Sequence, residues 1–313
     1  MKRTIDGFFK PNQKSAPPTE QSTEEPSKHE TYPLSVAQFP ASISDALGFA
    51  PATDGRLIDD RPDLDIVYYQ PYIPKEIEKE LFQFLRCELF FYRVQYNIKR
   101  GPVETQINTP RFTTVFGVDE SSYFSPQGHL LDAVTKRPIP KDRYKCKPRP
   151  IPGCLDQLRK ITERTTDQKF NFCLVNYYAN GNDSISYHSD DERFLGSNPA
   201  IASFSLGARR DFLMKHKPPN SNQKGAIDSE KPLKLPLASG DMLVMRGPTQ
   251  SNWLHSIPKR KGKDSDRGRI NITFRRAMVR GGTENYYTYN VGSGGVFKWS
   301  KERQEMVAWT AGS

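Results

Sequence analysis

The sequence has few cysteines, few histidines and no long apolar run, and these shortages narrow the class of protein. Its four cysteines, Cys87, Cys146, Cys154 and Cys173, show no CxxC spacing and are too few for a dense disulfide framework in 313 residues. No apolar run reaches the roughly 18 to 20 residues that span a bilayer, and the N-terminus lacks the apolar segment of a secretory signal. We therefore expect a protein of the cell interior with free thiols and no membrane partner.

The body of the chain is basic. Residues 61–313 contain 40 basic and 27 acidic side chains, whereas residues 1–60 contain 6 basic and 9 acidic ones. Such an excess favours a polyanionic partner such as nucleic acid, because neutralising phosphates releases counterions. Solubility alone would also explain the charge, so composition leaves both interpretations open.

Residues 1–60 are predicted to form a disordered N-terminal arm. Residues 11–60 are rich in Pro, Ser, Thr and Glu and show neither apolar alternation nor a long helical period. A segment of this kind cannot offset its ordering entropy by burial. The arm would act as a flexible tether for whatever lies at its tip.

The tip of this arm contains an apolar cluster. Ile5, Phe8 and Phe9 fall at i, i+3 and i+4, so one helical turn would present all three together. The spacing resembles the sliding-clamp (PCNA) interaction box, with Lys2 where the box has Gln. The alternatives are a segment that folds back on the domain and one that stays disordered.

Residues 61–285 are predicted to form a folded α+β domain, followed by a C-terminal extension of unknown role over 286–313. "LDIVYYQPYI" is typical of a strand, and an amphipathic helix is expected from Pro74 to about Leu89. Two strand-like stretches flank the turn pair Gly101-Pro102, which predicts a hairpin. A second helix, "CLDQLRKITERTT", precedes a run of short strands.

The stretch "SISYHSDDERF" suggests a metal site. His188 and Asp190 point to the same side of an extended segment, because side chains alternate with period 2. Two histidines and one carboxylate form the facial triad of non-haem Fe(II) oxygenases. A third ligand must come from elsewhere, and His255, which follows a strand and a turn, is favoured over His129 and His216. Histidines near acidic residues are common on protein surfaces, so this pair alone does not establish a metal site.

The segment "RINITFR", residues 269–275, alternates polar and apolar side chains. An ordinary half-buried strand would show the same alternation with its polar face in water. A cavity that binds a dicarboxylate would also need such a face, because only Arg offers a planar bidentate fork for a carboxylate. The two motifs together are more specific than either alone.

With "NYYANG" (176–181), "HSDDE" (188–192), "LGARRDF" (206–212), "WLHSIP" (253–258) and "RINITFR", the chain resembles the AlkB family of Fe(II) and 2-oxoglutarate-dependent dioxygenases. The resemblance is closest to the branch that repairs alkylated duplex DNA. It implies a double-stranded β-helix (jelly-roll) core with flanking helices, Fe(II) as cofactor, and 2-oxoglutarate and O2 as cosubstrates. It also implies a nuclear DNA repair enzyme that demethylates 1-methyladenine and 3-methylcytosine, releasing formaldehyde.

The resemblance also assigns roles to individual residues. The distal carboxylate of 2-oxoglutarate is expected on Arg275. The full sets are, for the metal, His188, Asp190 and His255, and for 2-oxoglutarate, Asn176, Tyr178, Arg269 and Arg275, with Asn271 and Thr273 as second choices.

On the substrate side, Asp191 is expected to contact the cationic methylated base, the alternative being that it pairs with Arg193, Arg209 or Arg210. A base in a duplex must flip out to reach a buried metal, and an apolar side chain eases this by filling the vacancy. Val103 is the expected wedge on the hairpin, and Tyr123 and Tyr144 are the expected stacking residues. Alternatives for the whole chain are an RNA or single-stranded DNA demethylase and an inactive DNA- or clamp-binding protein.

Overall fold

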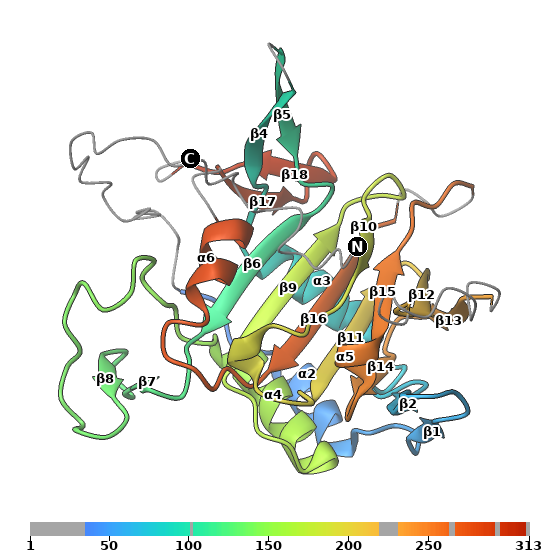
Figure 1. Ribbon diagram of the computed structural model, residues 1–313, viewed down its shortest axis with the longest axis horizontal. Coiled ribbons are helices and arrows are strands. Elements are labelled where there is room, and N and C mark those ends of the chain that lie inside the picture. The colour runs from blue at the N-terminus through green and yellow to red at the C-terminus, as the bar shows by residue number, and fades with distance from the viewer. Residues whose placement is uncertain (1–34, 101–102, 219–230, 263–266, 292–294, 311–313) are drawn as a thin grey trace.

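The computed structural model describes residues 35–100, 103–218, 231–262, 267–291 and 295–310, and it is built around two β-sheets (Figure 1). The larger sheet has the strand order β1 (Arg56–Ile58), β2 (Ile66–Tyr69), β14 (Met242–Met245), β11 (Ile201–Gly207), β16 (Arg269–Arg275), β9 (Phe172–Tyr178), β6 (Phe112–Gly117), β3 (Phe91–Tyr92), β17 (Val296–Ser300) and β18 (Glu305–Ala308). The smaller sheet has the order β10 (Ile185–His188), β15 (Trp253–Ile257), β12 (Arg210–His216) and β13 (Leu233–Leu237).

Two hairpins and several helices surround the sheets. The predicted hairpin is present as β4 (Gln95–Arg100) and β5 (Val103–Asn108), which project from one end of the molecule, and β7 (Ser122–Phe124) pairs with β8 (Leu130–Asp132) (Figure 1). The helical segments are α2 (Ala41–Ala46), η1 (Leu47–Phe49), α3 (Glu78–Glu88), α4 (Gly153–Thr166), η2 (Arg193–Leu195), α5 (Thr249–Asn252) and α6 (Glu284–Asn290). Within the described ranges, no helix has the length and apolar character needed to cross a bilayer.

Strand β16 shows why this sequence makes a two-sided sheet. Ile272 and Phe274 are fully buried in the apolar core, where Phe274 contacts Phe170 just after α4. The polar residues of the same strand are buried on the opposite face, toward the smaller sheet, rather than in water. The α+β class and the double-stranded β-helix are therefore confirmed, and the half-buried alternative for this strand is wrong.

The predicted arm is wrong for residues 35–60. Ile43 of α2 and Leu47 of η1 are four residues apart, so they lie on one apolar face, and both are buried in the core together with Phe39, which precedes α2. The pattern is short and lies among proline and serine residues, so the composition of the segment favoured disorder. The apolar cluster at residues 5–9 lies outside the described residues, and clamp binding stays a prediction.

The predicted C-terminal extension over 286–313 packs on the folded domain in its described part. Strand β17 extends the larger sheet by pairing with β3, Val296 opposite Tyr92. The Arg86 guanidinium of α3 lies 3.7 Å from the centre of the Trp299 ring, and the Thr113 hydroxyl on β6 donates to the Asn290 carbonyl of α6. Figure 1 shows α6 beside β6.

Candidate active site

A cavity of about 650 Å³ lies at the polar face of β16, and three predicted metal ligands meet in its wall. His188 and His255 are directly opposite each other in the β10–β15 pair, and Asp190 follows two residues after His188. One ligand atom from each of the three lies within 4.8 Å of the other two, and all three side chains are buried. The structure thus brings together the triad that the sequence predicted.

The protonation of the triad suits a divalent cation. The Ser186 carbonyl lies 2.8 Å from His188 Nδ1, which places the proton there and leaves the lone pair of Nε2 available. Burial lowers the pKa of both histidines, that of His255 to about 3, so both imidazoles are neutral. Burial alone would raise the pKa of Asp190, but the positive charge of Arg275 lowers it to about 2.

Two neutral imidazoles and one carboxylate are the donor set of the Fe(II) facial triad. Their neighbours fix them in place. Gln250 Oε1 accepts a hydrogen bond from the Asp190 backbone N–H at 3.0 Å, and the Phe212 ring stacks on His255 at 5.2 Å. The residues therefore fit a bound Fe(II).

Arg275 lies at the metal end of the cavity. Its Nη2 donates to Asp190 Oδ2 at 2.8 Å, and both side chains are buried. A ligand that chelates the metal would reach Arg275 with its chelating end, so the expected role on the distal carboxylate does not fit this position. Nε and Nη1 of Arg275 have no hydrogen-bond partner among the described residues and remain free to donate to a ligand.

Arg269, at the other end of β16, is the better candidate for the distal carboxylate. It is 1% exposed, and its Nη2 donates to Ser205 Oγ at 2.8 Å. Nε and Nη1 have no partner within the ranges described above, and burial lowers the pKa of the guanidinium to about 10. The described residues offer Arg269 no carboxylate within ion-pair distance, and burying a cation without a counterion costs several kcal/mol. This arginine is therefore poised for an anionic ligand.

The sequence matches the 2OG-Fe(II) oxygenase superfamily over residues 65–275. The chain belongs to this superfamily. It is 41% identical over 132 residues to human "DNA oxidative demethylase ALKBH2", covering 42% of this chain and 49% of that protein. It is 40% identical over 152 residues to mouse "Alpha-ketoglutarate-dependent dioxygenase alkB homolog 3", covering 48% of this chain and 52% of that protein.

An Arabidopsis thaliana "DNA oxidative demethylase ALKBH2" is 37% identical over 142 residues, covering 41% of this chain and 44% of that protein. The chain thus spans about half the length of the curated relatives it matches. These relatives confirm the resemblance to the AlkB family near its DNA repair branch. The shared cofactor set of the superfamily, Fe(II) with 2-oxoglutarate, agrees with the triad and the two arginines.

The second-choice residues of this oxygenase line the cavity but are bonded to their neighbours. Asn271 Nδ2 donates to Ser203 Oγ at 2.9 Å, and Thr273 donates to a backbone carbonyl.

The predicted 2-oxoglutarate residues Asn176 and Tyr178 also line the cavity. Asn176 Oδ1 accepts from Arg111 Nε at 3.0 Å, and Arg111, which the sequence analysis did not assign to the site, lines the cavity as well. Tyr178 lies under Arg269, whose guanidinium is 5.3 Å from the ring centre.

Glu192, rather than Asp191, faces the cavity of this oxygenase. Asp191 pairs with Lys217 at 2.8 Å and is absent from the cavity lining, which contains Glu192. Burial raises the pKa of Glu192 to about 7, and its Oε2 has no partner within the described part of the chain. The alternation that places Asp190 beside His188 continues to Glu192, so this signal was present in the sequence.

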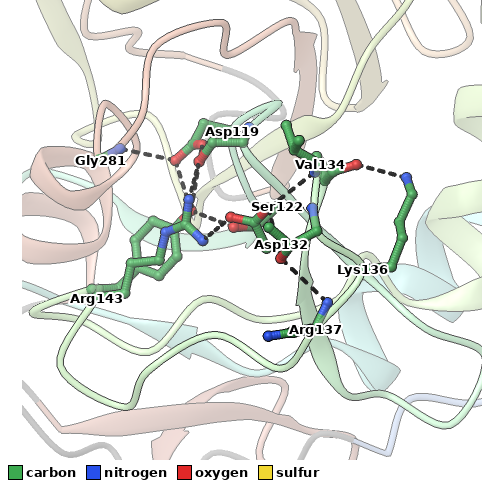
Figure 2. Close-up of polar contacts among 12 residues, drawn as sticks. Asp119, Ser122, Asp132, Val134, Lys136, Arg137, Arg143 and Gly281 are labelled. Atoms are coloured by element: carbon green, nitrogen blue, oxygen red, sulfur yellow. Dashed lines mark hydrogen bonds and ion pairs between the residues drawn. The ribbon is translucent and has the colours of Figure 1, made fainter.

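The two predicted stacking residues do not line the cavity. Tyr144 is buried, and its hydroxyl donates to Asp119 at 3.0 Å. Nearby, Arg143 pairs with Asp132 (Figure 2). Tyr123 is 38% exposed and lies against Lys136. The side chain of Val103 is outside the described residues, so the wedge stays a prediction.

Helix α6 contributes two aromatic side chains to the cavity wall, and the sequence analysis did not assign either of them to the site. Tyr286 and Tyr289 lie three residues apart in "NYYTYN" and both reach the cavity wall. Their helical spacing is visible in the sequence. The sequence does not reveal that the segment folds back over β6, which is a tertiary contact.

Proposed function

We propose that this oxygenase repairs DNA by oxidatively demethylating bases such as 1-methyladenine and 3-methylcytosine. One observation carries the proposal. A single cavity combines a metal triad with two arginines and a buried carboxylate oxygen, and the described residues leave N–H groups of both arginines and this oxygen without a partner. The names of the relatives, which include DNA oxidative demethylases, support DNA as the substrate class.

Each group in the cavity has a distinct task. His188, Asp190 and His255 would hold Fe(II), and Arg269 would bind the distal carboxylate of 2-oxoglutarate with Nε and Nη1. Iron, 2-oxoglutarate and O2, when bound, supply the oxidation that turns an N-methyl group into a hydroxymethyl group. That group then leaves as formaldehyde. The protein orients the methyl carbon and needs no acid or base of its own.

Glu192 would recognise the damaged base. Methylation of a ring nitrogen makes the base cationic, and both proposed substrates carry an exocyclic amine beside that nitrogen. Glu192 Oε2 is a buried acceptor in the cavity wall with no partner in the described part of the chain, and leaving such an atom unpaired costs about 1–3 kcal/mol. A hydrogen bond from the amine would remove this cost.

The experiment is a repair assay on oligonucleotides that carry 3-methylcytosine, as duplex DNA, single-stranded DNA and RNA. With Fe(II) and 2-oxoglutarate, the wild type should restore cytosine in DNA, measured by mass spectrometry, and His188→Ala should not. Restoration in RNA alone would support the RNA alternative. DNA binding with no turnover on any strand would support the inactive binding protein and contradict the proposal.

The N-terminal cluster at residues 5–9 motivates a second part of the proposal, clamp binding in the nucleus. A tethered contact would raise the effective concentration of the enzyme at replicating DNA. Phe8→Ala with Phe9→Ala should abolish binding to the clamp in calorimetry and leave repair of short oligonucleotides unchanged. No binding by the intact protein at about 10 to 100 µM, which is weak for a short motif, would refute this part.

A further inference from the structure

Tyr286 lies beyond residue 275, where the match to the superfamily ends, yet it forms part of the cavity wall. Its ring packs against Phe172 at 5.2 Å and Phe194 at 5.6 Å between ring centres. The side chain is 8% exposed. This packing fixes the direction in which the hydroxyl points.

Two contacts connect Tyr286 with the reactive groups. Its hydroxyl donates to Glu192 Oε1 at 2.7 Å. The guanidinium of Arg275, which bonds to the metal-binding Asp190, lies 5.1 Å from the centre of the Tyr286 ring. Tyr286 thus touches both the residue proposed to contact the base and the arginine at the metal end.

The hydrogen bond from Tyr286 makes the two carboxylate oxygens of Glu192 different. Oε1 is occupied by the tyrosine, and Oε2 is buried without a partner among the described residues. A carboxylate held at one oxygen has lost the torsional freedom that an incoming ligand would otherwise have to remove. Pre-organisation of this kind strengthens binding without adding a contact to the ligand.

We propose that Tyr286 is a positioning residue that holds Glu192 by Oε1, so that Oε2 accepts a hydrogen bond from the exocyclic amine of the methylated base. This inference rests on the proposed function and extends it to a helix outside the superfamily match. It makes α6 part of the substrate-recognition machinery.

The test compares Tyr286→Phe with Tyr287→Phe. Tyr287 lies on the same helix and its buried hydroxyl donates to the Gly117 carbonyl at 2.8 Å, but it does not line the cavity. Both changes remove one buried hydroxyl and keep the ring. Melting temperatures of both variants control for a general loss of stability.

Binding is measured by fluorescence anisotropy with Mn(II) in place of iron, so that no turnover occurs, on oligonucleotides with and without one 3-methylcytosine. Tyr286→Phe should weaken binding of the methylated oligonucleotide by up to about tenfold, because the ligand must then order a side chain that the tyrosine no longer holds. Binding of the unmodified oligonucleotide should not change. In turnover, the same variant should raise KM more than it lowers kcat, and Tyr287→Phe should match the wild type.

A double variant decides whether the effect passes through Glu192. In a Glu192→Gln background, Tyr286→Phe should cause little further loss, because the held carboxylate is already gone. If Tyr286→Phe has its full effect in the Glu192→Gln background, or if Tyr286→Phe and Tyr287→Phe behave alike, the inference is wrong. The proposed function would still hold if the wild type repairs methylated DNA. A wild type that neither prefers nor repairs methylated DNA would overturn both.

Discussion

Exchanging each arginine of β16 for lysine should separate their roles. Two nitrogens of Arg269, Nε and Nη1, have no partner among the residues that the structure describes, and Ser205 accepts from the third. A lysine ammonium is a point charge that cannot keep Ser205 and also bind a carboxylate through two parallel hydrogen bonds. Arg269→Lys should therefore lose at least one charge-assisted hydrogen bond to 2-oxoglutarate.

The expected loss of 2-oxoglutarate affinity follows from the loss of one hydrogen bond. One hydrogen bond to a charged group contributes about 1.5–3 kcal/mol, so the Kd for 2-oxoglutarate should rise roughly 10- to 150-fold. Metal affinity should stay within about twofold of the wild type, because no hydrogen bond or ion pair joins Arg269 to the triad within the described residues. Arg275→Lys should weaken metal binding as well, because it disturbs the bond to Asp190.

Calorimetry measures both affinities, first Mn(II) alone and then 2-oxoglutarate to the Mn(II)-loaded protein. The assignment would be refuted by an Arg269→Lys variant that binds 2-oxoglutarate like the wild type. A loss of 2-oxoglutarate affinity confined to Arg275→Lys, with normal metal binding, would restore the role expected from the sequence.

Three further outcomes are expected. His188→Ala should abolish Mn(II) binding in calorimetry but keep most of the DNA affinity, which phosphate contacts supply; full metal binding would exclude His188 as a ligand. Asp191→Asn should leave repair within about twofold, because this side chain pairs with the partly exposed Lys217; a tenfold loss would return Asp191 to the substrate site. Ile43→Ala should lower the free energy of unfolding by about 2–5 kcal/mol in urea titrations, and a change near zero would mean that α2 is not core.

Local alternation made much of the site predictable. The period of two places His188, Asp190 and Glu192 on one side, and the same period turns Arg269 and Arg275 toward one cavity. The prediction that Asp191 contacts the base does not agree with this period, which favours Glu192. The fold class was predicted from the resemblance to the AlkB family, which rests on a few short sequence motifs.

The remaining features depend on tertiary contacts that no local pattern reveals. That Arg275 bonds to Asp190 depends on how closely the segment after β10 approaches β16, and the alternation of β16 does not reveal this. Tyr144 carries a ring suited to stacking, but Asp119 holds its hydroxyl in a separate network. Tyr286 reaches Glu192 from 94 residues further along the chain.

A crystal structure of the protein with Mn(II), 2-oxoglutarate and DNA containing 3-methylcytosine tests the central claim most directly. The account predicts Mn(II) on His188, Asp190 and His255, the distal carboxylate of 2-oxoglutarate on Arg269, and the flipped base in the same cavity with its amine on Glu192. A metal bound elsewhere, or a methylated base that stays outside this cavity, would contradict it.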